Sequence, residues 1–190
     1  WAHVMAEAVL SLYPDAKLTI GPVVEDGFYY DIDMSPISED DLSTIEAEMK
    51  KIIKAKSTFE RRVVTKEEAL KIFADNPFKL ELINELSDQE ISLYQNGGFI
   101  DLCRGPHIPH TGMIKGIKLM KTSGAYWRAD QNREQLQRLY GTAFFDKKEL
   151  NRYINMIKEA RKRDHRKLGT KLDLFSFHTE APGMPFFHPK

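Results

Sequence analysis

A cysteine and a histidine four residues apart carry the clearest chemical signal in this sequence. Cys103 and His107 enclose Arg104-Gly105-Pro106, which breaks any strand and predicts a loop, where functional groups are often presented. At this spacing a thiol and an imidazole can meet around one centre, as metal ligands or as a catalytic pair. A single pair of this kind is a weak motif, so a buried thiol beside an unrelated histidine is the alternative.

Two other places offer side chains that could do chemistry. His3 begins a segment with apolar residues at helical spacing, where a lone histidine is more often structural. The run Ser123-Gly124-Ala125-Tyr126-Trp127-Arg128 combines small residues, which permit close backbone approach, with aromatic faces on which a base can stack. An aromatic pair in a strand is more often part of a core, so both interpretations stay open.

Helices at intervals along the chain would position these groups. Apolar residues recur with helical period, and Ser38 with Asp41, like Thr65 with Glu68, has the spacing of a capping box. Residues 77–86 fit a strand or a helix, and we favour the helix. The expected helices span residues 3–13, 38–56, 65–74, 77–86 and 146–168.

Short apolar runs predict strands between and after these helices. The turn Asn96-Gly97-Gly98, flanked by alternating apolar residues, is a strong hairpin signal. Because helices and hairpins are segregated along the chain, we expect an α+β fold with a mainly antiparallel sheet, packed helices and a long C-terminal linker helix. The expected strands span residues 16–20, 28–33, 58–64, 91–95 and 99–103, with two or three more strands in 115–122, 124–129 and 135–145.

Composition bounds the class of protein. The chain has 190 residues, 42% of them hydrophobic, which suits one domain or one domain plus a fragment. No stretch approaches the roughly 18 uninterrupted apolar residues of a membrane span. The single cysteine excludes a disulfide framework and indicates a reducing, cytoplasmic compartment. The chain begins with Trp1 and stops at Lys190 without a tail, so we expect a piece of a longer protein.

The net charge of zero hides an asymmetry. Residues 1–60 hold 12 acidic and 5 basic side chains, whereas residues 115–171 hold 16 basic and 6 acidic ones. A basic surface is the electrostatic signature of a polyanion partner, although a solvated charged helix has the same composition. The basic residues cluster most tightly at Lys158, Arg161, Lys162, Arg163, Arg166, Lys167 and Lys171, of which the first six are hereafter the basic segment.

The sequence also contains a set of distinctive runs. They are His3, GPVVEDGFYYDID at 21–33, CRGPH at 103–107, SGAYWRAD at 123–130, LQRLYGTAF at 136–144, KKELNRYINMIKEARKRDHRKLG at 147–169 and LDLFSFHTEAPGMPFFHPK at 172–190. Together they resemble bacterial-type threonyl-tRNA synthetases over essentially the whole chain. The resemblance points to the N-terminal editing domain of that family, which is similar to the editing domain of alanyl-tRNA synthetases. It implies an editing domain in residues 1–145, a linker helix in 146–168 and the truncated start of the class II catalytic domain in 169–190.

The resemblance also implies a set of site residues. The family's editing site has an HxxxH pair on a helix and a CxxxH pair opposite it. Cys103 and His107 match the second pair, and His3 matches the second histidine of the first pair, whose first histidine would stand two residues upstream of Trp1. Further matches are Asp101 to the acidic residue before the cysteine, Lys79 to a lysine near the scissile ester, and Tyr94 to a tyrosine lining the pocket.

The function implied by the resemblance is proofreading, in which water hydrolyses the ester of a mischarged Ser-tRNA. A histidine would orient or deprotonate the water, and Cys103 and His107 would shape the pocket. Lys79 would stabilise the leaving ribose oxygen, and Asp101 would bind the α-amino group of the substrate. The tRNA phosphates would contact Arg128, Arg133 and the basic segment.

We expect no metal and no cofactor in this chain. Zinc, ATP and the homodimer interface of the family are expected in the catalytic domain beyond it. Two rival interpretations remain from the residues themselves. The first is a non-catalytic tRNA-binding module, and the second is a freestanding metal-dependent aminoacyl-tRNA deacylase. The synthetase-like run at 172–190 argues against the second.

Overall fold

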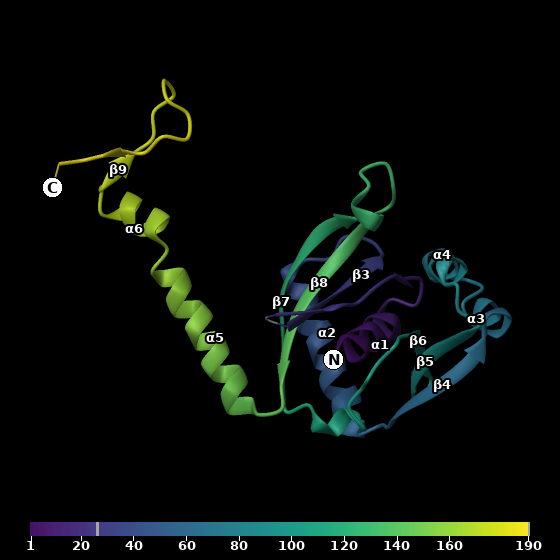
Figure 1. Ribbon diagram of the computed structural model, residues 1–190. Helices are drawn as coiled ribbons and strands as arrows, with labels where there is room; N and C mark the ends of the chain where they lie inside the picture. The colour runs from purple at the N-terminus through teal and green to yellow at the C-terminus, as the bar shows by residue number, and fades with distance from the viewer. Residues whose placement is uncertain (26, 190) are drawn as a thin grey trace. The chain divides into compact units, whose positions relative to one another are not determined.

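The computed structural model describes residues 1–25 and 27–189, which form two compact units. The first unit comprises Trp1–Lys147 and the second Lys148–Lys190 (Figure 1). The α+β class with antiparallel sheets is confirmed. Within the described residues, no helix has both the length and the apolar character needed to cross a membrane.

The larger sheet of the first unit has the strand order β1-β3-β8-β7, with β2 paired to the end of β3. All of its pairings are antiparallel. Two helices, α1 and α2, pack on one face of it, and the main core lies between them and the sheet (Figure 1). These elements are α1 (Ala2–Leu12), β1 (Lys17–Leu18), β2 (Val23–Val24), β3 (Gly27–Asp33), α2 (Glu39–Ala55), β7 (Gly116–Tyr126) and β8 (Gln135–Phe144).

A smaller antiparallel sheet, β4-β5-β6, lies on the other side of α1 (Figure 1). The side-chain amide of Asn96 in this sheet donates to the Glu7 carboxylate of α1 at 2.6 Å. Helix α1 is therefore held between the two sheets. The elements are β4 (Phe59–Thr65), α3 (Lys66–Ile72), α4 (Pro77–Glu85), β5 (Glu90–Asn96) and β6 (Phe99–Leu102).

Local sequence signals fix where these elements begin. Both predicted capping boxes are present, at Ser38 with Asp41 and at Thr65 with Glu68. The ambiguous segment 77–86 is a helix, as predicted, because Asn76 caps it and Pro77 occupies its first turn. The predicted hairpin turn joins β5 to β6, with Gly97 at a φ of 57°.

Of the two or three strands expected in residues 115–145, the structure has two. Strand β7 continues from 115–122 into 124–126, because Gly124 continues the pairing with β8; the chain then turns through the short 3₁₀ segment η2 (Trp127–Ala129). The expectation for the C-terminal helix is wrong. The helix predicted at 146–168 is two helices, α5 (Lys147–Lys162) and α6 (His165–Lys171). Asp164 interrupts it by capping the second helix through the backbone N–H of Arg166. The second unit ends in a two-stranded hairpin, β9 (Phe175–Ser176) with β10 (Phe186–Phe187).

The core of the first unit predicts a large cost for one substitution. Leu139 in β8 is fully buried, so Leu139→Ala should lower the free energy of unfolding by about 2–5 kcal/mol. Urea denaturation followed by tryptophan fluorescence measures this unit alone, because Trp1 and Trp127 both lie in it. Val63→Ala, at a position 47% exposed, should change the free energy by less than about 1 kcal/mol. Equal losses in the two variants would contradict this placement of the core.

Candidate active site

The helix-borne histidine and the CxxxH pair meet in the structure. His3 lies in the first turn of α1, and Cys103 and His107 lie in the loop that follows β6. Their candidate ligand atoms all lie within 4.8 Å of one another. The loop is held at its far end by the bridge between Thr58 and His110. Residues a hundred positions apart in sequence thus form one cluster.

Gly105 gives the CxxxH loop its shape. Its φ is 73°, in the left-handed region that favours glycine, and a Cβ there would overlap the hydroxyl of Tyr94. Tyr94, on β5, packs its ring against the imidazole of His107 with centroids 4.0 Å apart. Tyr94 therefore restrains the orientation of the His107 ring. It was expected to line the pocket, but it is absent from the lining of the cleft described below.

The hydrogen bonds of the two histidines fix where protons sit. His107 Nδ1 lies 2.9 Å from the carbonyl oxygen of Pro106, so this nitrogen must donate. Burial lowers the pKa of His107, which favours its neutral form, and Nε2 is then an acceptor. His3 Nδ1, 3.1 Å away, donates to it. His3 Nε2, the other ring nitrogen, faces Asp101 Oδ2 at 3.4 Å.

Behind the cluster lies a buried ion pair. Lys79 Nζ of α4 is 2.5 Å from Asp101 Oδ1 of β6, and the two residues are 2% and 1% exposed. Tyr30 of β3 donates its hydroxyl to Asp101 Oδ2 at 2.6 Å and accepts from Lys79 Nζ at 3.1 Å. The backbone N–H of Leu102 also donates to Asp101, at 2.8 Å. Three elements are thus joined at one carboxylate.

Tyr30 is a site residue that the sequence interpretation missed. It stands in the run FYYDID, where strand alternation places Phe28, Tyr30 and Ile32 on the core face. A buried phenol needs a hydrogen-bond partner, which was the available signal. Nothing in the sequence indicates that this partner is Asp101.

Burial and charge act in opposite directions on the titratable groups. Burial would raise the pKa of Asp101, but the Lys79 ammonium and His3 bring this pKa below its ordinary value. Burial, and then the Asp101 charge, raise the pKa of Tyr30, so its phenol stays protonated. Burial also opposes ionisation of Cys103, yet the neighbouring His3 and a hydrogen bond from the Gly105 N–H lower the pKa of this thiol overall.

The cluster opens into a cleft of about 710 Å³. Side chains of the cluster and of the ion pair, which contact one another, line one part of it, here called the polar end, and segments from α4 and from the β1–β2 connection line other parts. His107 is not in the lining, so its influence on a bound molecule passes through His3. The polar end is lined by His3, Tyr30, Lys79, Asp101 and Cys103, and the walls include Ile20, Gly21, Pro22, Leu82, Glu85 and Leu86.

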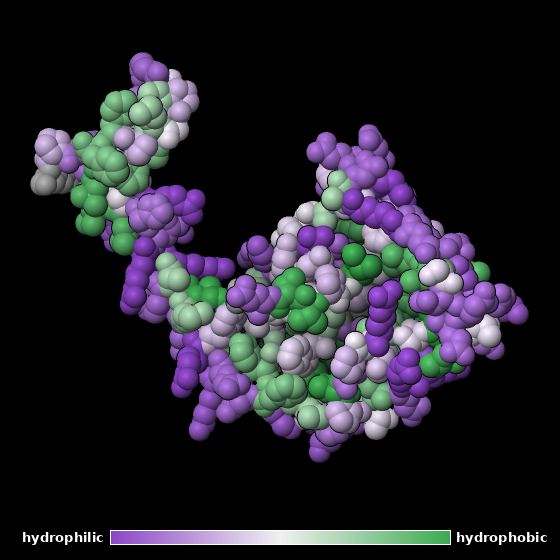
Figure 2. Space-filling view, in the orientation of Figure 1, coloured by the Kyte–Doolittle hydropathy of each residue, from purple (hydrophilic) through white to green (hydrophobic). Residues whose placement is uncertain are grey.

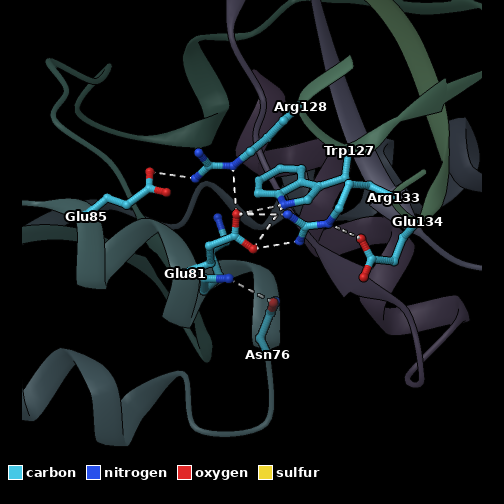
Figure 3. Close-up of polar contacts among 8 residues, drawn as sticks. Asn76, Glu81, Glu85, Trp127, Arg128, Arg133 and Glu134 are labelled. Carbon is cyan, nitrogen blue, oxygen red and sulfur yellow. Dashed lines mark hydrogen bonds and ion pairs between the residues drawn. The ribbon is translucent and has the colours of Figure 1, made fainter. Parts of the chain in front are cut away.

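The residues predicted to contact tRNA phosphates fall into two groups. The basic segment is exposed on α5, α6 and their junction, in the second unit (Figure 2). Two of its members pair with local acids, Lys162 with Glu159 and Arg166 with Asp164. Arg128 and Arg133 lie in the first unit, in the β7–β8 connection, and bind glutamates of α4 (Figure 3).

A metal can be tested against the cluster on chemical grounds. Imidazole nitrogen and thiolate sulfur are ligands that Zn²⁺ prefers, and His3, Cys103 and His107 would leave a fourth position open for water. The same nitrogens, His3 Nδ1 and His107 Nε2, are already satisfied by each other. The three side chains are therefore of the type that binds zinc, but the hydrogen bond between the two histidines also satisfies their facing nitrogens without a metal ion.

Comparisons with known proteins converge on one family. Residues 91–140, from β5 through the CxxxH loop into β8, match the family described as "Threonyl and Alanyl tRNA synthetase second additional domain". The chain is 74% identical over 189 residues to "Threonine--tRNA ligase" of Desulforapulum autotrophicum, covering 100% of this chain and 30% of that protein. The protein of the same name from Desulfatibacillum aliphaticivorans is 70% identical, and that from Caldanaerobacter subterraneus 53% identical, with the same coverage. The chain thus spans about 30% of the length of these relatives.

The buried ion pair predicts a stability change that does not depend on activity. Asp101→Asn should lower the free energy of unfolding by about 3–5 kcal/mol, because it leaves the Lys79 ammonium buried without a counter-charge. Adding Lys79→Met should recover much of that loss in urea denaturation at pH 7. A double variant as unstable as Asp101→Asn alone would contradict the assignment.

The dependence of the free energy of unfolding on pH in the acidic range gives an independent check of the same ion pair. Because the pKa of folded Asp101 is lowered, its contribution is present above the unfolded carboxyl pKa of about 3.9 and is lost as pH falls through the folded value. Asp101→Asn should therefore flatten the fall in unfolding free energy between about pH 5 and pH 3.

Proposed function

Since this chain is homologous over its whole length to a segment of threonine–tRNA ligases, we propose that it is an editing domain that hydrolyses Ser-tRNA. The observation that carries the proposal is the convergence of His3 and Cys103 with the buried Lys79–Asp101 pair at one end of a single cleft. An imidazole that can accept a proton, a carboxylate that stabilises the imidazolium and an ammonium that stabilises negative charge are groups that can catalyse ester hydrolysis.

The need for such a domain follows from the size of the substrates. Serine is threonine without one methyl group, and a missing methyl changes binding by only about 1–3 kcal/mol. A synthetic site that accepts threonine therefore also charges some serine. A second cleft can select in the opposite direction, because it can admit serine and exclude the larger threonine by a clash with its methyl group. The relatives are named as ligases of threonine and tRNA, which supplies this setting.

The geometry supports a water-mediated mechanism. His3 Nε2 takes a proton from water as the oxygen attacks the ester carbonyl carbon, and Asp101, 3.4 Å away, stabilises the imidazolium that forms. The bond from the carbonyl carbon to the ribose oxygen then breaks, and the proton passes to that oxygen. Lys79 stabilises negative charge on the reacting oxygens. The products are free serine and deacylated tRNA.

The structure favours a changed role for Asp101. It is 1% exposed and already accepts hydrogen bonds from Lys79, Tyr30 and the Leu102 N–H. We therefore assign it to holding Lys79 and polarising His3, in place of the expected contact with the α-amino group. Cys103 shapes the pocket and is not a nucleophile, because attack by water needs no covalent intermediate.

The rest of the proposal concerns the longer protein. Threonine attachment to tRNA with ATP, the zinc and ATP sites, and the homodimer interface are assigned to sequence outside this chain. The tRNA is the partner of this segment, presenting its aminoacylated 3′ end to the cleft. A purely tRNA-binding module would not require the convergence of His3, Cys103 and Lys79, so this rival is disfavoured.

Hydrolysis of mischarged tRNA tests the proposal directly. The full-length protein should deacylate Ser-tRNA much faster than Thr-tRNA, and Lys79→Ala or His3→Ala should slow Ser-tRNA hydrolysis by about 100-fold or more. Single-turnover rates with radiolabelled aminoacyl-tRNA give the measurement. Cys103→Ala should lower the rate through pocket shape, and no seryl thioester should be trapped.

Two arms of that assay decide between the rivals. Dialysis against a chelator should leave the rate within about twofold, because proton transfer to His3 needs no metal. A loss restored by zinc would favour the metal-dependent deacylase. An absence of any hydrolysis, with tRNA binding intact, would favour the binding module.

The basic segment generates a separate prediction about affinity. Arg161, Lys162 and Arg163 are exposed, so replacing all three with Ala should weaken tRNA binding and reduce its dependence on salt, with the slope falling by about 1 per lost phosphate contact. Filter binding at several salt concentrations measures both. The preference for Ser-tRNA over Thr-tRNA should survive, because the cleft sets it. An unchanged salt slope would indicate that this segment mainly connects the editing domain to the catalytic domain.

A further inference from the structure

Helix α4 presents two charged faces to two different parts of the first unit. On one face Lys79 reaches inward to Asp101 and Tyr30 at the polar end of the cleft. On the other, Glu81 and Glu85 face the connection between β7 and β8 (Figure 3). Ile83 in the core and the Asn76 side chain, which donates to the Leu18 carbonyl oxygen at 2.8 Å, anchor this nine-residue helix from inside. The contacts of its outer face are a further restraint on its position.

Glu81 is the centre of that outer contact. Its carboxylate accepts from Arg128 Nε at 2.8 Å, from an Arg133 terminal nitrogen at 2.8 Å and from the indole N–H of Trp127 at 3.2 Å (Figure 3). Arg128 also binds Glu85 at 2.6 Å. The hydrogen bond from Arg133, helped by the other donors, lowers the pKa of Glu81. Three donors from one connection thus meet one acceptor on α4.

Packing reinforces the charges. The ring of Trp127 is 2% exposed and meets Phe78 of α4 edge-on, with centroids 5.2 Å apart. Arg128 and Ala129 have φ values of 56° and 59°, a left-handed conformation that is unfavourable for non-glycine residues. The connection is therefore held in an unfavourable backbone conformation in which Arg128 reaches both glutamates.

We propose that Arg128 and Arg133 are positioning residues that hold α4, through Glu81, so that Lys79 stays at the polar end of the cleft. Its catalytic consequence rests on the hydrolysis proposed above. The contact between the β7–β8 connection and α4 is only partly buried, with side-chain exposures of 29–37% at Arg128, Arg133 and Glu81. Partly exposed ion pairs of this kind add little to the free energy of unfolding. We therefore assign their effect to the placement of the Lys79 ammonium group.

The same arginines were expected to bind tRNA phosphates. The two roles predict different effects of removing their partner, Glu81, on tRNA affinity and on the chemical step. If they bind phosphate, removing Glu81 frees both guanidinium groups and tightens tRNA binding. If they position α4, removing Glu81 is as harmful to the chemical step as removing Arg133, and tRNA affinity does not change. Glu81→Ala therefore separates the two roles.

The experiment uses the full-length protein with the variants Glu81→Ala, Arg133→Ala and Arg133→Lys. Glu67→Ala is the matched control, because Glu67 is an exposed glutamate on the neighbouring helix α3. Single-turnover hydrolysis of Ser-tRNA at saturating protein gives the chemical rate, and the concentration dependence gives the affinity. An activated acetyl ester transfers its acetyl group to the free amine of lysine and releases its alcohol. Acetylation of Lys79, read by mass spectrometry, therefore reports how far its Nζ is released from the ion pair and accessible, without any need for activity.

Glu81→Ala and Arg133→Ala should each slow the chemical step by about 10-fold or more, since small displacements of a catalytic group cost that much, while affinity and its salt slope stay constant. Acetylation of Lys79 should rise at least about fivefold as α4 loosens. Arg133→Lys should restore part of both effects, and Glu67→Ala should match the unchanged protein.

Three outcomes would overturn the proposal. The first is unchanged acetylation of Lys79 in Glu81→Ala. The second is an Arg133→Ala variant that hydrolyses slowly only at low protein concentration, with a normal rate at saturating protein. The third is tighter tRNA binding in Glu81→Ala. If the unchanged protein hydrolyses no Ser-tRNA, the function proposed above fails, yet the acetylation result still decides whether the β7–β8 connection holds Lys79 in place.

Discussion

A buried ion pair between Lys79 and Asp101 is the constraint on which the architecture of the first unit depends. Charges this deep in a protein are costly unless each is paired and hydrogen-bonded. Asp101 meets this condition only because Tyr30, the Leu102 N–H and His3 also approach it. These groups come from β3, β6, α1 and α4, so the pair requires both sheets and two helices to be in register at once.

The pair also places charge where a reaction can use it. A continuous set of contacts runs from His107 through His3 and Asp101 to Lys79. His107 is tied to the Pro106 carbonyl and is favoured as neutral, and His3 lies between it and the anionic carboxylate of Asp101. In the hydrolysis proposed above, the cleft would hold one proton acceptor, His3, and one fixed ammonium in a preorganised arrangement, and such electrostatic preorganisation is usually the largest single contribution to catalysis.

Charge acts differently in the second unit. The basic segment is exposed on helices α5 and α6, and its local acids leave most of the positive charge available. Arg128 and Arg133 have the same residue type but are held by Glu81 and Glu85. Charge composition therefore identifies an electropositive region, and only partner geometry separates arginines that face solvent from arginines that hold a helix.

The sequence by itself determined the local elements and the chemical types of the site. Capping boxes, the Asn96-Gly97-Gly98 turn and the caps of α4 depend on residues within a few positions of one another, so they can be read along the chain. The motif resemblance also marked His3, Cys103 and His107. Tertiary structure decided the rest. Tyr30 donates to Asp101, which is 71 positions away, and Tyr94 packs on His107, which is 13 positions away. Arg128 pairs with glutamates of α4 that are about 45 positions away. Such contacts depend on how strands and helices meet in space, and the alternation or periodicity of one segment says which face a side chain takes but not what it meets there.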